Sequence, residues 1–377
     1  MNKPKKILLI SHIANSIGPV QKMEEFLIQK KSCFAVIGHP YEFTSNESFL
    51  KIYSNGKIIS EKKIIRKKKL SAIAYIEDIF LSIRIYKKYL DSNFELCFGF
   101  DPLNAISAII IKKIYRINKV IYYSVDYAEK RFENFFLNYI YHLLDKFASR
   151  HADYCWSVSN SIRNIRKHLR IPDKKNILAP NGLNINEICT TPEFPKNNIF
   201  YIGVLSKTKG VHSLIDIMPQ ILKQNPLVKL HIIGGGPDEE FLQTLAQKKG
   251  ISDRINFYGY TKQERTNKIL SLGGIGVAPY EDTEDYVRFC DPLKVKNYLA
   301  MGIPVVMTKI PALAEEIEEN SLGFAVENKK EMADRINEIL SDSNKYMLFR
   351  NNALKAKKMY DINMIYDQAF QKISYNI

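Results

Sequence analysis

The chain has 377 residues, of which 46% are hydrophobic and 25% charged, and its formal net charge is +15. This composition excludes a disordered or fibrous protein, and the length allows two domains of ordinary size. Five cysteines without any Cys-x-x-Cys spacing argue against a zinc site and favour a reducing compartment. The N-terminus is too short in apolar residues for a signal peptide, and the run 105–111 is too short to span a bilayer. We therefore expect a cytoplasmic protein that is soluble or peripheral to a membrane.

Short β-rich runs alternate with helical stretches in the first half, which is typical of parallel sheets covered by helices on both faces. Strands are predicted at 5–11, 33–39, 95–101, 119–126, 154–159 and 176–181. Helices are predicted at 20–31, 71–90, 102–117, 132–150 and 160–169. Polar residues follow these strands, where doubly wound folds place their chemistry.

A second series of elements begins near residue 197, after a Pro-containing polar segment that we interpret as a linker. Its predicted strands are 198–205, 228–235, 254–260, 274–280, 303–308 and 323–327. From residue 329 to the end only helices are expected. The sequence predicts an α/β protein of two Rossmann-like, doubly wound domains at 1–187 and 197–355, followed by a terminal helix within 356–377.

Two helix starts carry lysines where a cation is unfavourable. In "CDPLKVKNYLAMGIPVV" (290–306), Asp291 is expected as N-cap and Pro292 at the first helical position, with Lys294 in the first turn. Lys207 and Lys209 precede another helix, directly after the strand 198–205. A helix N-terminus is already partly positive, so a cation there is favourable only when an anion binds. The two helix starts together predict a diphosphate site.

A glycine-rich turn joins a strand to a helix at 231–241. Its three consecutive glycines are Gly234, Gly235 and Gly236, but no further Gly follows at the spacing of a dinucleotide-binding fingerprint. A tight turn with close backbone approach is the better interpretation. In "INFYGY" (255–260), an aromatic ring or a backbone amide could face a nucleobase, and buried aromatic packing is the alternative.

These motifs occur in the order and spacing of a known family. "YIGVLSKTKG", "LHIIGGGP", "INFYGY", "GVAPY" and "PLKVKNYLAMGIPVV" lie between 201 and 306, with "APNGLN" (179–184) and "SHIANSIGPVQKMEEFL" (11–27) before them. The chain resembles the nucleotide-sugar glycosyltransferases of the GT-B fold, most closely the large family 4 (glycosyl transferases group 1). The resemblance implies two Rossmann-like domains facing a cleft, an acceptor domain first and a donor domain second, with C-terminal helices packing back on the first.

The family moves a sugar from a nucleotide diphosphate, here expected to be UDP-linked, without a catalytic metal and with no cofactor besides this co-substrate. Carried over by position, the donor-binding residues are Gly18, Gly203, Lys209, Gly234, Gly235, Gly236, Phe257, Tyr258, Gly259, Tyr280, Glu281, Asp291, Pro292, Leu293, Lys294 and Asn297. The resemblance places Lys209 and Lys294 at the leaving diphosphate.

The same resemblance places Tyr280 and Glu281 at the sugar and Asn297 at the ribose. The chain departs from the family where Phe289 and Asn297 replace a pair of glutamates, and where Val204 replaces an Arg. The donor sugar and the stereochemistry, retaining or inverting, are therefore left open. Asp291 is a possible substitute for the first glutamate.

Acceptor activation by a base would need a carboxylate or a histidine in the first half. Asp126, at the end of the strand 119–126, is the preferred candidate, and the family often has His or Asp there. His12 and Asp101, which also lie at the ends of predicted strands, are the alternatives, and His12 is assigned to the acceptor side.

A basic cluster, "EKKIIRKKKL" (61–70), includes Lys67 and Lys68 and is expected in a solvated loop or helix face. With Arg131, Phe132 and the phenylalanines that follow, it predicts docking on an anionic inner membrane and a lipid-linked glycan acceptor. Cell-surface polysaccharide synthesis is the expected role. Three alternatives remain: an inverting GT-B transferase that uses Asp126 as base, a nucleotide-sugar epimerase, and a basic nucleic-acid-binding protein, for which no recognition motif is present.

Overall fold

The computed structural model forms two compact units. Unit 1 contains Met1–Pro180 and Ile365–Ile377, and unit 2 contains Asn181–Met364. The structure describes residues 6–13, 18–41, 47–65, 72–90, 94–115, 117–190, 197–282, 286–375 and 377. The side chains of 72–74 and of Lys207 lie outside this description.

Unit 1 is built on a sheet whose strands follow the order β4-β3-β2-β1-β5-β6-β7-β8. The strands are β1 (Lys6–Ile13), β2 (Cys33–Pro40), β3 (Glu47–Ser54), β4 (Lys57–Ile65), β5 (Leu96–Phe100), β6 (Lys119–Ser124), β7 (Tyr154–Ser157) and β8 (Asn176–Leu178). The helices are α1 (Pro19–Gln29), α2 (Ala72–Tyr89), α3 (Pro102–Tyr115), α4 (Phe135–His151) and α5 (Asn160–His168). The neighbouring strand pairs β2–β1, β1–β5, β5–β6, β6–β7 and β7–β8 are all parallel, as expected for a Rossmann-like domain.

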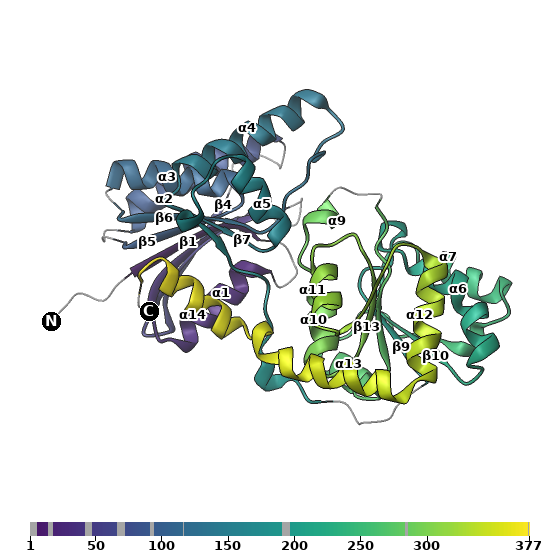
Figure 1. The fold of residues 1–377 in the computed structure, drawn as a ribbon. Coiled ribbons are helices and arrows are strands. Elements are labelled where there is room, and N and C mark those ends of the chain that lie inside the picture. Colours follow the sequence, from purple (N-terminus) through teal and green to yellow (C-terminus); the bar gives the residue numbers. More distant parts are fainter. Residues whose placement is uncertain are drawn as a thin grey trace. The chain divides into compact units, whose positions relative to one another are not determined.

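The terminal helix α14 (Ile362–Lys372) brings the end of the chain back to unit 1, where it runs beside α1 (Figure 1). Phe370 stacks on Phe26 of α1 and meets the edge of Trp156 from β7, with ring centroids 5.9 and 5.1 Å apart. Tyr366 packs edge-on against the same Phe26 ring. Buried aromatic area thus holds the C-terminal helix on this face of the sheet, as the family resemblance implied.

The antiparallel hairpin of β3 and β4 was not predicted. Asn55 and Gly56 connect the two strands with φ of 50° and 71°, the left-handed values that a two-residue hairpin turn requires. The basic cluster at 61–70 is therefore in part an edge strand rather than a loop or helix face: Lys62 lies over the Tyr89 ring, and Lys63 pairs with a glutamate of β3. Residues 66–70, with Lys67 and Lys68, lie outside the described part of the chain.

Unit 2 has a fully parallel sheet in the order β11-β10-β9-β12-β13-β14. Its strands are β9 (Asn198–Ile202), β10 (Lys229–Ile233), β11 (Ile255–Phe257), β12 (Ile275–Ala278), β13 (Val305–Thr308) and β14 (Gly323–Val326). Its helices are α6 (Val211–Gln224), α7 (Glu239–Lys248), α8 (Gln263–Leu270), α9 (Tyr286–Phe289), α10 (Leu293–Ala300), α11 (Leu313–Glu319), α12 (Lys329–Ser341) and α13 (Ser343–Ala356). Helices α6, α7 and α12 cover one face, and α10 and α11 cover the other (Figure 1).

The boundaries between the units lie at Pro180 and Met364, whereas the two domains predicted from the sequence end at 187 and 355. Asn181 donates its backbone N–H to Asp291 and accepts from Lys296, so the segment after Pro180 already packs with unit 2. Leu183 and Tyr360 are joined by a backbone hydrogen bond, which keeps the start of 356–377 in unit 2 as well. Among the described residues, no helix has the length and apolar character needed to cross a membrane.

Candidate functional site

The predicted donor residues of unit 2 gather where its strand order reverses. From β9 the chain proceeds to β10 and β11 on one side, and β12 then pairs with the other side of β9. Ligands of doubly wound sheets bind outside the carboxyl ends of the strands at such a switch point. Gly203 follows β9, Gly234 follows β10 and Tyr280 follows β12, so three of the loops expected at the donor meet at this edge.

Lys294, in the first turn of α10, extends its ammonium group into this edge. Its Nζ lies 4.5 Å from the ring centroids of both Tyr201 and Tyr280. A Cβ added at Gly203 would stand only 3.5 Å from the same Nζ, so the lysine reaches the end of β9. Burial lowers the pKa of Lys294 to about 7, with a further contribution from the charge of Lys209.

Lys209 approaches the same place from the loop between β9 and α6. Its Nζ donates to the Tyr286 hydroxyl and lies 4.4 Å from the centroid of that ring. Both ammonium groups act on the Cys290 thiol, whose pKa burial raises to about 11 and the two lysines lower. The structure thus brings together two lysines that are far apart in the sequence.

Glycines let the loops approach one another at this edge. Gly234 has φ of 134°, and a Cβ there would meet the carbonyl oxygen of Gly203 at 2.0 Å. A Cβ at Gly236 would meet the carbonyl oxygen of Leu205 at 2.3 Å. These turns hold only without side chains, which agrees with the interpretation as tight turns.

The expected nucleobase residues Phe257, Tyr258 and Gly259 are all half-buried. Phe257 packs against the apolar core, and the Tyr258 hydroxyl is bonded to His231, 2.8 Å away. Burial and the nearby Lys229 lower the pKa of His231 to about 4, so this pair is a neutral contact. Both rings are half-buried and packed within unit 2, so a nucleobase contact by either of them stays a prediction.

Tyr260 is an exposed aromatic residue that sequence reasoning missed. It is 77% exposed, and a Cβ at Gly235 would lie 2.7 Å from its ring. The ring therefore stands beside the glycine turn, two residues after Tyr258, and Gly259 has the left-handed φ of 63° that turns the chain there. The final Tyr of "INFYGY" was the available signal, and an exposed ring at this edge offers a stacking surface.

Glu281 is oriented by the first turn of α6. Its Oε1 accepts from Ser213 at 2.8 Å and lies 3.1 Å from His212 Nε2. The preceding Tyr280 is buried and forms one side of the Lys294 site. A carboxylate held in this way next to the cationic site could accept hydrogen bonds from the hydroxyl groups of a sugar.

Asp291 does not cap α10, so the N-cap prediction is wrong. Pro292 is the N-cap residue, Leu293 begins the helix, and the Asp291 carboxylate pairs with Lys296 at 2.6 Å. Burial raises the pKa of Asp291, and the Lys296 charge opposes that shift. Asp291 is thus occupied inside unit 2, which makes it a poor substitute for a sugar-binding glutamate; Asn297, one turn after Lys294, is half-buried.

The first-half candidates all lie in unit 1. Asp126, two residues after β6, forms an ion pair with Arg131 at 2.6 Å. Arg131 also lies over the Tyr141 ring, and Phe132 meets that ring edge-on. Gly18 is the N-cap residue of α1. His12 and Asp101 form a cluster with other charged residues that is described below.

Residues 191–356 match the family model of glycosyl transferases group 1. Spore coat protein SA of Bacillus subtilis (strain 168) is 29% identical over 163 residues, which cover 40% of this chain and 41% of that protein. A putative colanic acid biosynthesis glycosyltransferase, WcaL of Escherichia coli (strain K12), is 26% identical over 128 residues, 34% of this chain and 32% of that protein. The chain spans less than half the length of these curated relatives.

Among solved structures, HepE of Anabaena in complex with UDP superposes with a TM-score of 0.74 at 16% identity, covering 98% of this chain and 99% of that chain. The chain therefore has the GT-B fold of two Rossmann-like units. Residues 191–356 are similar to the glycosyl transferases group 1 family, whose model they match.

Proposed function

We propose that the protein is a glycosyltransferase of the hexosyltransferase type that uses a UDP-linked sugar as donor. Its acceptor would be a glycan or lipid-linked glycan in cell-surface polysaccharide synthesis. The observation that carries the proposal is the position of Lys294: its Nζ lies at the switch point, 4.5 Å from the Tyr201 and Tyr280 ring centroids, where burial and the Lys209 charge disfavour an ammonium group without a bound anion. A diphosphate at this switch point supplies that anion, and UDP bound to HepE and the colanic acid role in the name of WcaL support the donor and the pathway class.

In this proposal the donor's C1–O bond to the diphosphate breaks, the acceptor oxygen bonds to C1 on the same face, and the acceptor's hydroxyl proton passes to the leaving phosphate oxygen. The two ammonium groups stabilise the negative charge that develops on the leaving phosphate oxygen, which is work that a Mg²⁺ ion does in other enzymes. Lys209 and Lys294 would thus make the reaction metal-independent. Tyr260 would stack on the nucleobase, and Glu281 would bind hydroxyls of the donor sugar.

Retention of configuration is the proposed stereochemistry. An inverting reaction with Asp126 as base is the alternative; that carboxylate is paired with Arg131, and its side chain is 47% exposed. A nucleotide-sugar epimerase and a nucleic-acid-binding protein are further alternatives.

The test is nucleotide release from UDP-, GDP- and ADP-sugars, with methyl glycosides of glucose, galactose and N-acetylglucosamine as acceptor probes. We expect UDP release that rises with acceptor, persists in EDTA, and yields a product of unchanged anomeric configuration by NMR. Loss of activity in EDTA alone refutes metal independence. Interconversion of the donor sugar without acceptor would identify an epimerase. Binding to a heparin column but not to UDP-agarose would identify a nucleic-acid-binding protein.

We also propose that unit 1 docks on an anionic membrane surface through the outer face of α4. Phe135 and Phe136 are 85% and 66% exposed, and the face continues along the helix with apolar residues of the following turns. The exposed apolar residues of this helix are Phe135, Phe136, Leu137, Tyr139, Leu143 and Phe147. Lys146 and Arg150 are exposed beside them, so aromatic and cationic groups occur together as at a lipid interface.

Sedimentation with phosphatidylglycerol-containing and pure phosphatidylcholine vesicles tests this docking. We expect binding to the anionic vesicles only, and about tenfold weaker binding for a Phe136→Ser, Leu143→Ser double variant, because each side chain loses apolar burial. Leu227→Ser, an exposed leucine of unit 2, is the matched control. Equal binding to neutral vesicles, or none to either, contradicts the proposal.

A further inference from the structure

Unit 1 has a switch point of its own, between β1 and β5. From β1 the chain proceeds to β2 on one side, and β5 pairs with the other side of β1. His12 is the second-to-last residue of β1, and Asp101 directly follows β5. The two side chains therefore flank the edge position at which doubly wound sheets bind ligands.

His12 is held between two carboxylates. Its Nδ1 lies 3.0 Å from Asp101 Oδ2, and its Nε2 lies 3.0 Å from Asp78 Oδ2 of α2. Burial opposes a charged imidazole, but the two carboxylates outweigh it and raise the pKa of His12 to about 9. Both ring nitrogens are engaged, and the raised pKa favours a charged imidazolium at neutral pH, which argues against the expected alternative of His12 as a general base.

The inner part of the cluster is rigidly bonded. Asp78 also lies 3.5 Å from Nδ1 of His39, the residue that pairs with His12 in the parallel register of β1 and β2. His39 is in turn bonded to the hydroxyls of Ser48 and Ser82 at 2.9 and 2.8 Å. These groups are buried, so they position His12 and offer no surface to a ligand.

Asp101 is the member of the cluster that reaches solvent. Its side chain is 26% exposed, against 7% for His12. Its backbone has φ of 76°, a left-handed conformation that costs energy outside glycine and that occurs often at functional sites. Its Oδ1 accepts from Asn104 N at 3.0 Å and its Oδ2 from Asn104 Nδ2 at 2.6 Å. A carboxylate has about four lone-pair sites, so these bonds and the His12 bond leave room for one more donor.

We propose that Asp101 binds a hydroxyl group of the acceptor sugar on unit 1, and that His12 is the residue that positions it. The inference rests on the proposed function for the identity of this ligand as the acceptor. With two carboxylates and one imidazolium, the cluster has an excess negative charge, which favours a neutral hydroxyl over an anionic group. The acceptor is therefore recognised here through its sugar and not through a phosphate.

NMR of the protein labelled with ¹⁵N-histidine tests the site directly, with the same methyl glycosides as probes and His12→Gln to assign the His12 signals. We expect a saturable shift of the His12 ring nitrogens with at least one glycoside. Asp101→Asn should weaken glycoside binding about tenfold, because the hydrogen bond from the sugar hydroxyl to a charged carboxylate is lost. Asp153→Asn is the matched control, since Asp153 is similarly exposed and pairs with Lys112 outside the cluster.

The charge on His12 adds a readout that a purely structural role would not change. Glycoside affinity should fall as the pH rises through about 9, where His12 loses its proton, and His12→Gln should lack this dependence. The groups that face His12 are Asp78 and Tyr75 from α2, His39 from β2, Asp101 after β5 and Asn104 from α3.

In turnover, Asp101→Asn should raise the acceptor KM by a larger factor than it lowers kcat. Unchanged glycoside binding in Asp101→Asn, or no shift of His12 with any probe, overturns the inference. A failed proposed function would show itself separately, as wild-type protein that releases no nucleotide from any donor although glycosides still bind.

Discussion

Replacement of Lys294 by alanine is expected to weaken UDP binding at least tenfold and to lower kcat/KM about 100-fold. The lysine would contact the diphosphate in the ground state and the leaving oxygen in the transition state, where preorganised charge has its largest effect. Isothermal titration with UDP and initial rates of nucleotide release measure the two effects. Because burial disfavours the Lys294 charge in the free protein, the substitution should not destabilise the fold.

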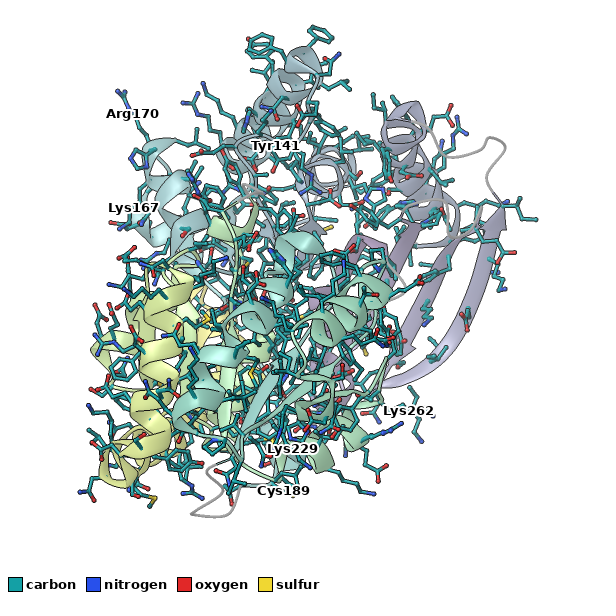
Figure 2. The ribbon with its side chains drawn as sticks, turned by 90° about the vertical axis from the view of Figure 1, so that its right-hand side faces the viewer. Tyr141, Lys167, Arg170, Cys189, Lys229 and Lys262 are labelled. Atoms are coloured by element: carbon teal, nitrogen blue, oxygen red, sulfur yellow. The ribbon has the colours of Figure 1, made fainter. Side chains whose placement is uncertain are left out.

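Lys229→Ala is the charge-matched control. Lys229 begins β10, at the opposite edge of the same sheet, and its exposed side chain is labelled in Figure 2. UDP affinity should not change in this variant. Full UDP affinity in Lys294→Ala would show that the assigned diphosphate site is wrong.

The depressed pKa of Lys294 adds a pH dependence to this prediction. Below about pH 7 the ammonium is charged and attracts the diphosphate; above it the free protein holds a neutral amine, so UDP affinity should fall as the pH rises. Lys294→Arg keeps a charge throughout this range and should flatten the profile. A wild-type affinity that rises with pH would contradict the assignment.

Replacement of Arg166 by methionine is expected to destabilise unit 1 by about 4 kcal/mol. Arg166 is fully buried and donates to Asp145 and to the Ser124 hydroxyl, each at 2.8 Å. Without the guanidinium, the Asp145 carboxylate is left buried and uncompensated, which typically costs 3–5 kcal/mol. Urea unfolding followed by the fluorescence of Trp156, the only tryptophan and a buried residue of unit 1, reports on this unit.

Two variants make the interpretation specific. The double variant Arg166→Met, Asp145→Leu removes both charges and should recover most of the lost stability. Arg170→Ala removes an exposed arginine that points outward after α5 (Figure 2) and should change the free energy of unfolding by no more than about 0.5 kcal/mol. A double variant as unstable as Arg166→Met alone would contradict an electrostatic origin.

The strands of unit 2 could be predicted from sequence because each is a short apolar run between polar segments. Most of their ends were set too late: the run at 198–205 ends as a strand at Ile202, because Gly203 turns the chain with φ of 151°. In unit 1, the hairpin of β3 and β4 was missed although Asn55-Gly56 is a strong turn signal. The lysines at 61–70 were interpreted as a solvated loop or helix face, because clusters of charge are typical of exposed segments.

In the candidate site, too, some features were visible in the sequence and others were not. The lysine at the start of α10 was visible locally, as a cation in the first turn of a helix. Lys296, two residues later, is buried against Asp291, a pairing that was not predicted. Its second partner is the carbonyl oxygen of Asn181, 115 positions earlier in the chain, so no local pattern could reveal it.

The sequence by itself determined the alternation of strands and helices, the helix ends that carry Lys209 and Lys294, and the glycine turns between them. Each of these depends on neighbours within a few residues, which set backbone conformation and apolar periodicity. Only the tertiary structure decided which charges meet: His12 with Asp78 and Asp101, and Arg166 with Asp145. Those partners come from different strands and helices, so their pairing, burial and pKa values follow from strand order rather than from spacing along the chain.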